Sequence, residues 1–386
     1  MKRLLALVLS AAMFFSLAAG CTPADQTDDG QTSPTADAGG EGGYTIATNN
    51  FGVGAYPLDM MVANEQSAAD ATGMTLTVTN NEFTADKVIT QLQNQLAASP
   101  DGVAFLGISE TLFPVAAQYC KNAKTPYVFY ACSPTDEDME KIEQDEYYVG
   151  MVIYSPKNEG SRLAELALAD GCKTAVISAG ASGDYAHDRR LIGFTETFEA
   201  GGGEILFVSH SADPSEAVQK TNDYMTAYGD TDCIYATGED YITPAADVIK
   251  SRGITDCKIY GSNISPSVCQ LIMDGQVEAC TGGEFVCGSL AVTLLINYLD
   301  GNPIKDADGT APYFDNLTQF MVTAENAEDF YEFLSDENLA THTISDEEYQ
   351  NLLVRNNPDV DYDYFYDFLT NYEENVYAKV EANAAQ

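Results

Sequence analysis

The chain has 386 residues, of which 18 are Lys or Arg and 59 are Asp or Glu, and its formal net charge at pH 7 is −41. This excess of negative charge excludes electrostatic binding to nucleic acid or to an anionic membrane surface. Hydrophobic residues make up 45% of the chain, which is ordinary for a globular protein, and the length leaves room for two domains of common size.

The N-terminus has the pattern of a bacterial export signal. Two basic residues precede an apolar run from Leu4 to Phe15, and small residues then lead to Cys21 in the stretch "SLAAGC". An apolar run of about a dozen residues is too short to span a bilayer stably and is typical of a cleaved signal. The ending resembles the lipobox of bacterial lipoproteins, so we expect removal of residues 1–20 and attachment of a lipid to Cys21. An ordinary secretory signal followed by a chance cysteine is the alternative.

A polar segment follows the signal. Residues 22–43 are rich in Thr, Pro, Asp, Gln, Ser and Gly and contain no large apolar side chain, so they cannot form a core. Residues 21–43 are therefore predicted to be a disordered tether, and the fold is expected to begin near Tyr44. No later segment approaches 18 uninterrupted apolar residues, which predicts that no transmembrane helix follows.

The remaining eight cysteines are predicted to be small buried residues, since most lie in apolar stretches such as "DCIYATG" and "EACTGGEFVCG". There is no Cys-x-x-Cys pair and the chain has three histidines, so a zinc cluster is poorly supported and we expect no metal or other cofactor. Export makes a disulfide possible, with Cys280 and Cys287 as the nearest pair, but the sequence does not establish connectivity.

Short β-rich runs alternate with helical runs from Tyr44 onwards. The strand candidates, each bounded by Gly, Asp, Asn or Pro, are "YTIATNN", "MTLTVTN", "GVAFLGI", "PYVFYAC", "KTAVISAG", "GEILFVSH", "DCIYATG", "CKIYGSN" and "VEACTG". Between them apolar residues recur at helical spacing, as in "TADKVITQLQNQLAAS", where Thr84 can cap the helix, and "SPKNEGSRLAELALADG", where Gly171 supplies a stop. This alternation predicts an α/β fold with largely parallel sheets covered by helices.

So many strands divide more readily between two sheets than they fit into one, so we expect two Rossmann-like lobes joined by a hinge. Residues 44–154 are assigned to the N-terminal lobe, which is completed by about residues 284–316, and residues 155–283 to the C-terminal lobe. Residues 317–386 are predicted to form a late strand and an acidic helical extension rich in Tyr and Phe. Its expected helices lie near 324–334, 344–355 and 362–382.

The chain lacks the common catalytic motifs. There is no Gly-x-Ser-x-Gly, no Gly-rich phosphate loop ending in Gly-Lys-Ser/Thr and no His-Glu-x-x-His. The stretch "SAGASG" at 178–183 follows a strand but lacks the Gly-x-Gly-x-x-Gly spacing of a dinucleotide turn. We therefore expect a binding protein and not an enzyme. Open parallel sheets bind ligands at the carboxyl ends of their strands, so two facing lobes would form a cleft that can close around a solute.

The order and spacing of several stretches resemble the type I periplasmic binding proteins, which bind ribose, galactose and related solutes for ABC importers. The resemblance runs over residues 44–325. The stretches that carry it are "YTIATNNFGVGAYPLDM", "PDGVAFLGIS", "TPYVFY", "RLIGFTETFEA", "TDCIYATGEDYITPAADVIKSRG" and "KIYGSNISPSVCQLIMDGQVEACTGGE". The resemblance implies a small-molecule solute held between two hinged lobes and an ABC permease as the membrane partner. We expect the protein to be a monomer.

The resemblance also implies positions for ligand contacts. Arg190 stands where the family has an Arg ahead of Gly-Phe, and in the sugar binders this guanidinium grips ring and hydroxyl oxygens as a two-pronged donor. Asn49 or Asn50 falls in the first ligand loop, which commonly holds Asn, while Phe51 and Tyr56 could supply aromatic walls. The full set of candidate ligand-binding residues is Asn49, Asn50, Phe51, Tyr56, Tyr130, Arg190, Tyr241, Asn263 and Glu284.

Other positions depart from the pattern of the sugar binders. Asn263 stands where the family usually has Asp, and Glu284 or its neighbour Gly283 replaces the hinge-side Gln. The strand ending in Tyr130 is followed by Ala-Cys in place of Asp-Arg, and the run before Tyr241 lacks the usual Asn-Asp. Fewer acceptors for sugar hydroxyls remain, which disfavours a ribose-like ligand and leaves a sugar or a similar ring-bearing polar metabolite.

Each candidate also has a purely structural interpretation. Arg190 could pair with an acid on a helix surface, Phe51 and Tyr56 could pack within a lobe, and Asn263 could satisfy the backbone at a turn. Arg189 projects roughly 100° away from Arg190 on a helix, so it is expected to face solvent and pair with nearby acids. For the whole protein, the alternatives to an importer component are a lipoprotein that presents solute to a membrane receptor or kinase, and an extracellular hydrolase.

Overall fold

The computed structural model describes residues 43–386 apart from 213, 337, 339–340 and 386, and the described residues belong to one compact unit. The predicted signal peptide, the lipidated Cys21 and the tether lie outside the described residues. Among the residues that are described, no helix combines the length and the apolar character needed to cross a membrane.

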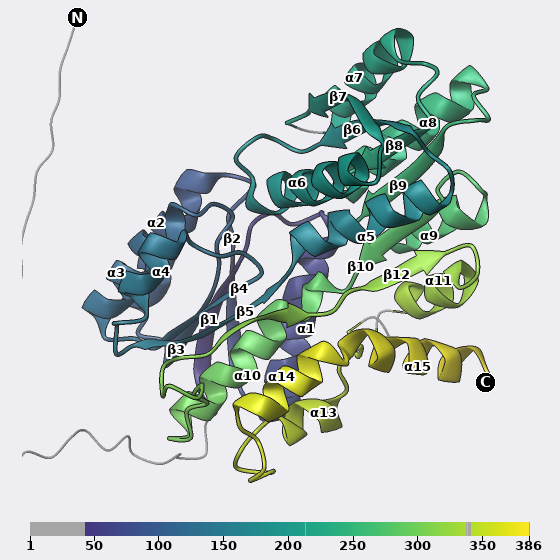
Figure 1. The fold of residues 1–386 in the computed structure, drawn as a ribbon. Coiled ribbons are helices and arrows are strands. Elements are labelled where there is room, and N and C mark those ends of the chain that lie inside the picture. Colours follow the sequence, from purple (N-terminus) through teal and green to yellow (C-terminus); the bar gives the residue numbers. More distant parts are fainter. Residues whose placement is uncertain (1–42, 213, 337, 339–340, 386) are drawn as a thin grey trace, which may run out of the picture. The chain divides into compact units, whose positions relative to one another are not determined.

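The described strands form two six-stranded sheets (Figure 1). The first sheet has the order β11-β5-β4-β3-β1-β2 and is parallel throughout. Its strands are β1 (Thr45–Asn50), β2 (Thr75–Asn80), β3 (Gly102–Leu106), β4 (Tyr127–Tyr130), β5 (Tyr148–Tyr154) and β11 (Tyr313–Leu317). Strand β5 was not predicted from the sequence. Its run is interrupted by Gly150, where the register with β4 also shifts.

The second sheet has the order β12-β10-β9-β8-β6-β7, and only the pair of β10 and β12 is antiparallel. Its strands are β6 (Thr174–Ala179), β7 (Glu204–His210), β8 (Cys233–Ala236), β9 (Lys258–Ser262), β10 (Ala279–Gly282) and β12 (Phe320–Thr323). Central strands such as "GVAFL", "YVFY" and "CIYA" are buried along their whole length, as expected for parallel strands covered on both faces. The prediction of two parallel α/β lobes is therefore confirmed.

Helices cover both faces of the first sheet. Figure 1 shows α2, α3 and α4 on one face and α1 and α10 on the other. These helices are α1 (Tyr56–Thr72), α2 (Ala85–Ala97), α3 (Leu112–Ala123), α4 (Asp136–Ile142) and α10 (Cys287–Leu299). Thr84 is the N-cap of α2 as predicted, but its hydroxyl donates to the backbone oxygen of Glu82 instead of capping the helix. Helix α10 is buried from Cys287 to Asn297, so this late segment forms part of the first lobe's core.

Two helices of the second lobe pack unusually closely. The helices of this lobe are α5 (Pro156–Ala169), α6 (Tyr185–Ala200), α7 (Pro214–Ala227), α8 (Glu239–Arg252) and α9 (Pro266–Met273). A Cβ at Gly160 would lie 2.1 Å from the backbone oxygen of Arg190, and one at Gly193 would lie 1.9 Å from that of Lys157. Only glycine fits at either position, and the close approach of α5 and α6 brings their buried polar side chains into contact.

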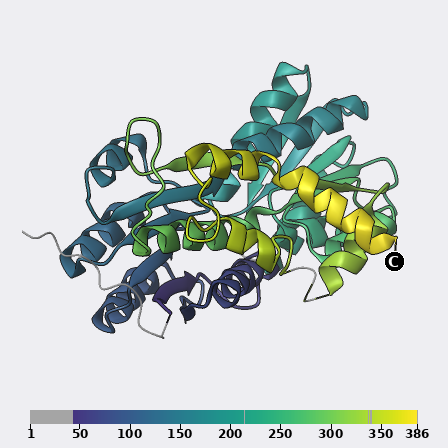
Figure 2. The same ribbon diagram turned by 90° about the horizontal axis from the view of Figure 1, so that it is seen from below.

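The C-terminal extension is helical, as predicted. Its helices include α11 (Ala327–Ser335), α13 (Asp346–Asn351), α14 (Tyr362–Thr370) and α15 (Tyr372–Ala384). The single helix expected over 362–382 is two helices that meet at Asn371. Figure 2 shows the yellow C-terminal helices running across the face of the molecule that is turned toward the viewer. Helix α13 packs on α1, α14 on β11, and α15 on β12 and α11, so the extension contacts both lobes.

Polar contacts fix the extension to both lobes. In the first lobe, Arg355 donates from Nη2 to the backbone oxygen of Thr72 at 2.9 Å. In the second lobe, Arg162 donates from Nη2 to Glu373 Oε1 at 2.7 Å. The eight cysteines of the described chain are buried free thiols, so the pairing considered for Cys280 and Cys287 is not formed.

Candidate functional site

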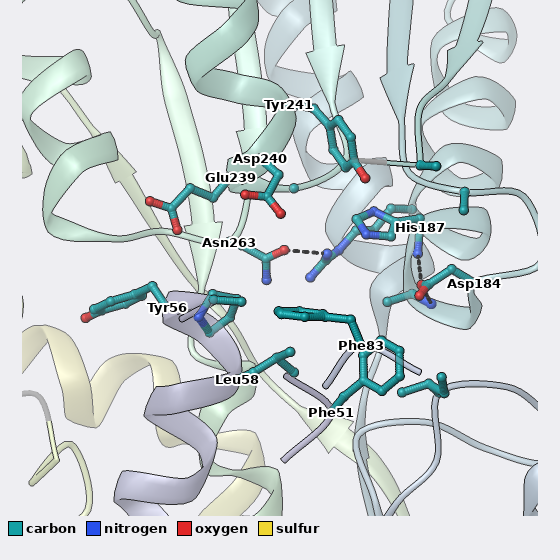
Figure 3. Close-up of a pocket in the computed structure, with 18 of the residues that line it drawn as sticks. Phe51, Tyr56, Leu58, Phe83, Asp184, His187, Glu239, Asp240, Tyr241 and Asn263 are labelled. Carbon is teal, nitrogen blue, oxygen red and sulfur yellow. Dashed lines mark hydrogen bonds between the residues drawn. The ribbon is translucent and has the colours of Figure 1, made fainter. Parts of the chain in front are cut away.

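A cavity of about 1100 Å³ lies between the carboxyl ends of the strands of the two sheets (Figure 3). From the first lobe, its walls come from the segments after β1, β2, β3 and β4 and from the end of β5. From the second lobe, they come from the segments after β6, β7, β8, β9 and β10. This is the edge at which open parallel sheets bind ligands.

Arg190 on α6 lines this cavity and is only 2% exposed. Its Nε donates to Glu159 Oε2 at 2.6 Å, and its Nη1 donates to the backbone oxygen of Thr237 at 3.0 Å and to Asn263 Oδ1 at 2.8 Å. Its Nη2 donates to the hydroxyl of Tyr154 at 3.4 Å. Three of the five guanidinium N–H groups thus have short partners within the protein, which holds the group in one orientation.

Glu159 on α5 was not among the residues predicted from the sequence. It is buried, and besides Arg190 it accepts from Thr281 Oγ1 at 2.5 Å. The arginine is therefore the partner of a buried carboxylate, and the helix-surface ion pair considered as an alternative is not what the structure shows. The sequence signal was the Glu-Gly pair inside a helix, because Gly160 is what allows α6 to come close enough for this contact.

Asn263 connects the arginine to a second buried acid. Its Nδ2 donates to Glu284 Oε1 while its Oδ1 accepts from Arg190. Its backbone has φ 68°, a left-handed conformation that Asn tolerates better than most residues. Glu284 is 2% exposed, and its Oε2 has no hydrogen-bond partner within the described chain. Burial raises the pKa of Glu284, and the nearby Glu159 raises it further, while Arg190 opposes both effects.

Two more acids stand at the N-terminus of α8, where the helix dipole favours negative charge. Glu239 Oε1 accepts from Ser265 Oγ at 2.5 Å and from Ser267 Oγ at 2.7 Å. The neighbouring Asp240 is exposed to the cavity. Burial raises the pKa of both carboxyls. Figure 3 shows Glu239, Asp240 and Tyr241 on one side of the cavity.

His187 and Asp184 extend this polar wall along α6. Asp184 caps the helix by accepting from the backbone N–H groups of Ala186 at 3.0 Å and His187 at 3.1 Å. The Nδ1 of His187 lies 2.9 Å from Thr237 Oγ1, and its ring meets Tyr241 edge to face at 5.4 Å between centroids. Burial lowers the pKa of His187, which favours the neutral imidazole.

The opposite side of the cavity is aromatic. Phe51 and Phe83 meet edge to face with ring centroids 5.8 Å apart, and Figure 3 shows them with Leu58 across the cavity from Glu239 and Asp240. Phe83 is 56% exposed and has φ 54°, which is strained for a bulky side chain. A Cβ at Gly52 would lie 2.4 Å from its ring. The sequence analysis missed Phe83, and its signal was an aromatic residue placed shortly after the end of β2.

The structure places six of the nine predicted ligand residues on the cavity walls. They are Phe51, Tyr56, Arg190, Tyr241, Asn263 and Glu284. The other three do not line the cavity and bond to neighbouring backbone or side chains. Asn49 donates to the backbone oxygen of Leu106 at 3.1 Å, Asn50 donates to Asp59 Oδ1 at 3.0 Å, and Tyr130 donates to the backbone oxygen of Asn49 at 3.3 Å. These three side chains therefore stabilise the first lobe next to the cavity and do not line it.

Arg189 lies outside the cavity and is partly exposed. Its Nη2 donates to Glu110 Oε1 at 3.0 Å, and its guanidinium carbon is 4.6 Å from the centre of the Tyr185 ring. Pairing with a nearby acid was predicted, but the acid belongs to the segment after β3 of the first lobe. The pair therefore joins the two lobes beside the cavity.

Comparison with known proteins agrees with this architecture. Residues 58–303 match the family described as periplasmic binding protein domain. The chain therefore belongs to this family, as the sequence stretches had implied. No protein of curated function is similar in sequence.

Solved structures of low sequence identity share the fold. A galactofuranose binding protein has 16% identity and a TM-score of 0.68, with 77% of this chain and 99% of that chain covered. A second structure is the binding protein of the arabinose ABC transporter from Shewanella sp. ANA-3, bound to α- and β-L-arabinofuranose. It has 16% identity and a TM-score of 0.67, with 77% of this chain and 97% of that chain covered. A periplasmic sugar-binding protein from Pseudomonas fluorescens has 14% identity and a TM-score of 0.72, with 83% of this chain and 97% of that chain covered. The fold is that of type I periplasmic binding proteins.

Proposed function

We propose that the protein is a lipid-anchored, extracytoplasmic solute-binding protein that delivers a small sugar or similar ring-bearing polar molecule to an ABC permease. The observation that carries this proposal is the cavity at the carboxyl ends of two parallel sheets, with an aromatic wall on one lobe and a polar wall on the other. A solute that contacts both walls bridges the lobes and stabilises their closed arrangement, which a permease can recognise.

The chemistry of the walls suits a polar ring. Phe51 and Phe83 offer apolar ring faces and edges for stacking. Asn263 and the acids at the start of α8 offer hydrogen-bond acceptors and donors to the hydroxyl groups of a solute. Arg190 donates to Asn263 and so fixes the orientation of that side chain. Family members are binding proteins. Of the solved structures named above, one is bound to arabinofuranose, and the other two are described as a galactofuranose binding protein and a sugar-binding protein.

Isothermal titration calorimetry tests the proposal. The folded protein from Tyr44 onwards is titrated with a panel of pentoses, hexoses, furanoses, inositols and nucleosides. We expect at least one to bind with micromolar or better affinity, and to raise the midpoint of thermal unfolding accordingly. The absence of binding across the panel would argue against solute capture as the function.

The membrane anchor and the oligomeric state need separate experiments. Cys21→Ser should prevent lipid attachment and release the protein from the membrane fraction into the medium or periplasm, while an N-terminal mass measurement of the wild type should show a diacylglyceryl cysteine. We propose a monomer in solution, which size-exclusion chromatography with light scattering measures directly. Retention of Cys21→Ser in the membrane would oppose lipid anchoring without affecting the ligand proposal.

A further inference from the structure

The charge of the cavity is strongly unbalanced. Arg190 is the only Arg or Lys among the described residues that line it. The carboxylates that line it are Asp184, Glu239, Asp240, Asp247 and Glu284. The charge of Arg190 is already matched by Glu159, whose Oε2 is 2.6 Å from the guanidinium. A solute therefore meets a surface with more negative than positive charge, and anionic solutes are disfavoured.

One of these carboxylates stands out because it is buried and incompletely bonded. Glu284 is 2% exposed, its Oε1 accepts from Asn263, and its Oε2 has no hydrogen-bond partner in the part of the chain that the structure describes. A buried carboxylate oxygen that no protein group bonds is a strong acceptor for a ligand donor, because a hydrogen bond made there offsets the free-energy cost of burial. The other buried acid nearby, Glu159, differs in this respect. Both of its carboxylate oxygens accept hydrogen bonds from the protein.

The remaining walls suit a cation. Asp240, on the same polar side, is exposed to the cavity, and Figure 3 shows it across the cavity from Phe51 and Phe83. Aromatic faces attract ammonium groups within about 6 Å of the ring centroid. Burial lowers the pKa of His187, which disfavours a positive charge on the polar wall. A solute with a protonated amine would therefore meet carboxylate acceptors on the polar wall, with the aromatic wall facing its remaining atoms.

We propose that the solute carries a protonated amino group as well as hydroxyl groups, as in an amino sugar, and that Glu284 binds this group while Asp240 adds negative charge to the same cavity. The proposal rests on the solute-binding function proposed above and names its chemical class. The ammonium donates hydrogen bonds to the free oxygen of Glu284, while the ring and its hydroxyls occupy the space between Asn263 and the phenylalanines. No bond is made or broken, and the proton stays on the amine.

Matched probes test this class directly. Calorimetry compares glucosamine with glucose and N-acetylglucosamine, galactosamine with galactose, and mannosamine with mannose, and putrescine serves as an amine without a sugar ring. A charged hydrogen bond in a buried site is expected to favour the amino member of at least one pair by about tenfold or more. The N-acetyl compound should lose this preference, because acetylation removes the charge.

Substitutions assign the preference to residues. Glu284→Gln keeps the shape and should reduce affinity for the amino sugar by about tenfold or more while leaving the parent sugar within about threefold. Asp240→Asn should reduce affinity for the amino sugar by a smaller factor. Because Asp240 is exposed, this substitution replaces no buried group and should leave folding unchanged. The matched control is Glu278→Gln, an exposed glutamate directly before β10, away from the cavity. Thermal unfolding confirms that each variant is folded.

The outcomes separate this inference from the proposed function. Preference for the amino sugar that is lost in Glu284→Gln, or in Asp240→Asn if the first variant does not fold, supports both. Tighter binding of a neutral sugar than of its amino partner overturns the inference and leaves the sugar-binding function standing. Binding of putrescine without any sugar supports the amine site and opposes the sugar. Binding of none of these probes overturns both.

Discussion

The two lobes build opposite walls of one cavity from different kinds of residue. The first lobe supplies Phe51, Tyr56 and Phe83, carried on the segments after β1 and β2. The second supplies acids, a histidine and one arginine, carried on α6, α8 and the segments after β9 and β10. The comparison shows a division of tasks, in which one wall contributes shape and apolar contact while the other contributes charge and hydrogen bonds. A ligand must contact both walls to bridge the lobes.

The two lobes also differ in the acids that they bury behind the cavity walls. Glu159 in the second lobe is buried and paired with Arg190 at 2.6 Å. Glu65 on α1 in the first lobe is fully buried as well, but it accepts from the neutral hydroxyl of Thr48 at 3.1 Å, and its Oε2 has no partner among the described residues. Burial raises the pKa of Glu65 to about 8. One lobe therefore buries a charged pair and the other a carboxyl that is protonated at neutral pH.

The largest effect is expected from Arg190→Ala. Removing the guanidinium leaves Glu159 buried without its partner, which should lower the free energy of unfolding by about 3–5 kcal/mol. Ligand affinity should fall at least about tenfold, because Asn263 and Glu284 lose the group that orients them. Denaturant unfolding and calorimetry with the tightest-binding solute measure the two effects. The double variant Arg190→Met with Glu159→Leu should regain stability without regaining binding, and recovery of both would contradict the role given to the polar wall.

Glu65→Gln tests the buried carboxyl of the first lobe. Since the pKa of Glu65 is raised in the folded state, its contribution to stability is full below about pH 4.5 and is lost as the pH rises towards about 8. The loss across this window is up to about 5 kcal/mol, because a difference of one in pKa between the folded and unfolded states corresponds to about 1.4 kcal/mol. Glu65→Gln should therefore unfold less readily than the wild type at pH 9 and show a weaker pH dependence in urea. Identical pH profiles of the two proteins would show that Glu65 is charged and solvated.

A smaller effect is expected from Phe83→Ala, which removes part of the aromatic wall. Solute affinity should fall by about tenfold, as loss of an aromatic contact typically costs about 1 kcal/mol or slightly more. Stability should change little, because Phe83 as a whole residue is 56% exposed and its backbone is strained. The control is Val53→Ala, which alters a side chain of the facing loop after β1 that is 60% exposed and does not line the cavity. Equal losses of affinity in both variants would point to a general change of these loops.

The fold was largely predictable because it follows from local patterns. Alternating strands and helices, bounded by glycines and turn residues, indicated two parallel sheets before any contact was known. The boundaries within the extension were less predictable. Its apolar spacing continues from Tyr362 to Ala384, and only the backbone at Asn371, with φ −92° and ψ 3°, separates α14 from α15. Spacing alone does not reveal such a break.

The residues that line the cavity were predictable only where the position of a residue along a strand or helix determines the direction of its side chain. Asn263 and Glu284 follow strand ends, Arg190 lies on the helix after β6, and all three line the cavity. Asn49 also lies near the end of a strand, yet its side chain bonds to Leu106 of the adjacent strand, a choice that depends on the neighbouring backbone. Glu159 was missed for the same reason, since its function comes from a helix contact and not from its own sequence neighbours.

The smallest effect is expected from Arg189→Ala, and this makes it the sharpest partner to Arg190→Ala. The two arginines are adjacent, but Arg189 is partly exposed and its pair with Glu110 is screened by solvent, so stability should change by less than about 1 kcal/mol. Affinity should change by less than about threefold, because Arg189 does not line the cavity. Whatever change occurs should shrink at high salt, since the contact joins two exposed charges across the lobes. Equal losses of affinity in Arg189→Ala and Arg190→Ala would mean that joining the lobes, and not the chemistry of the polar wall, determines binding.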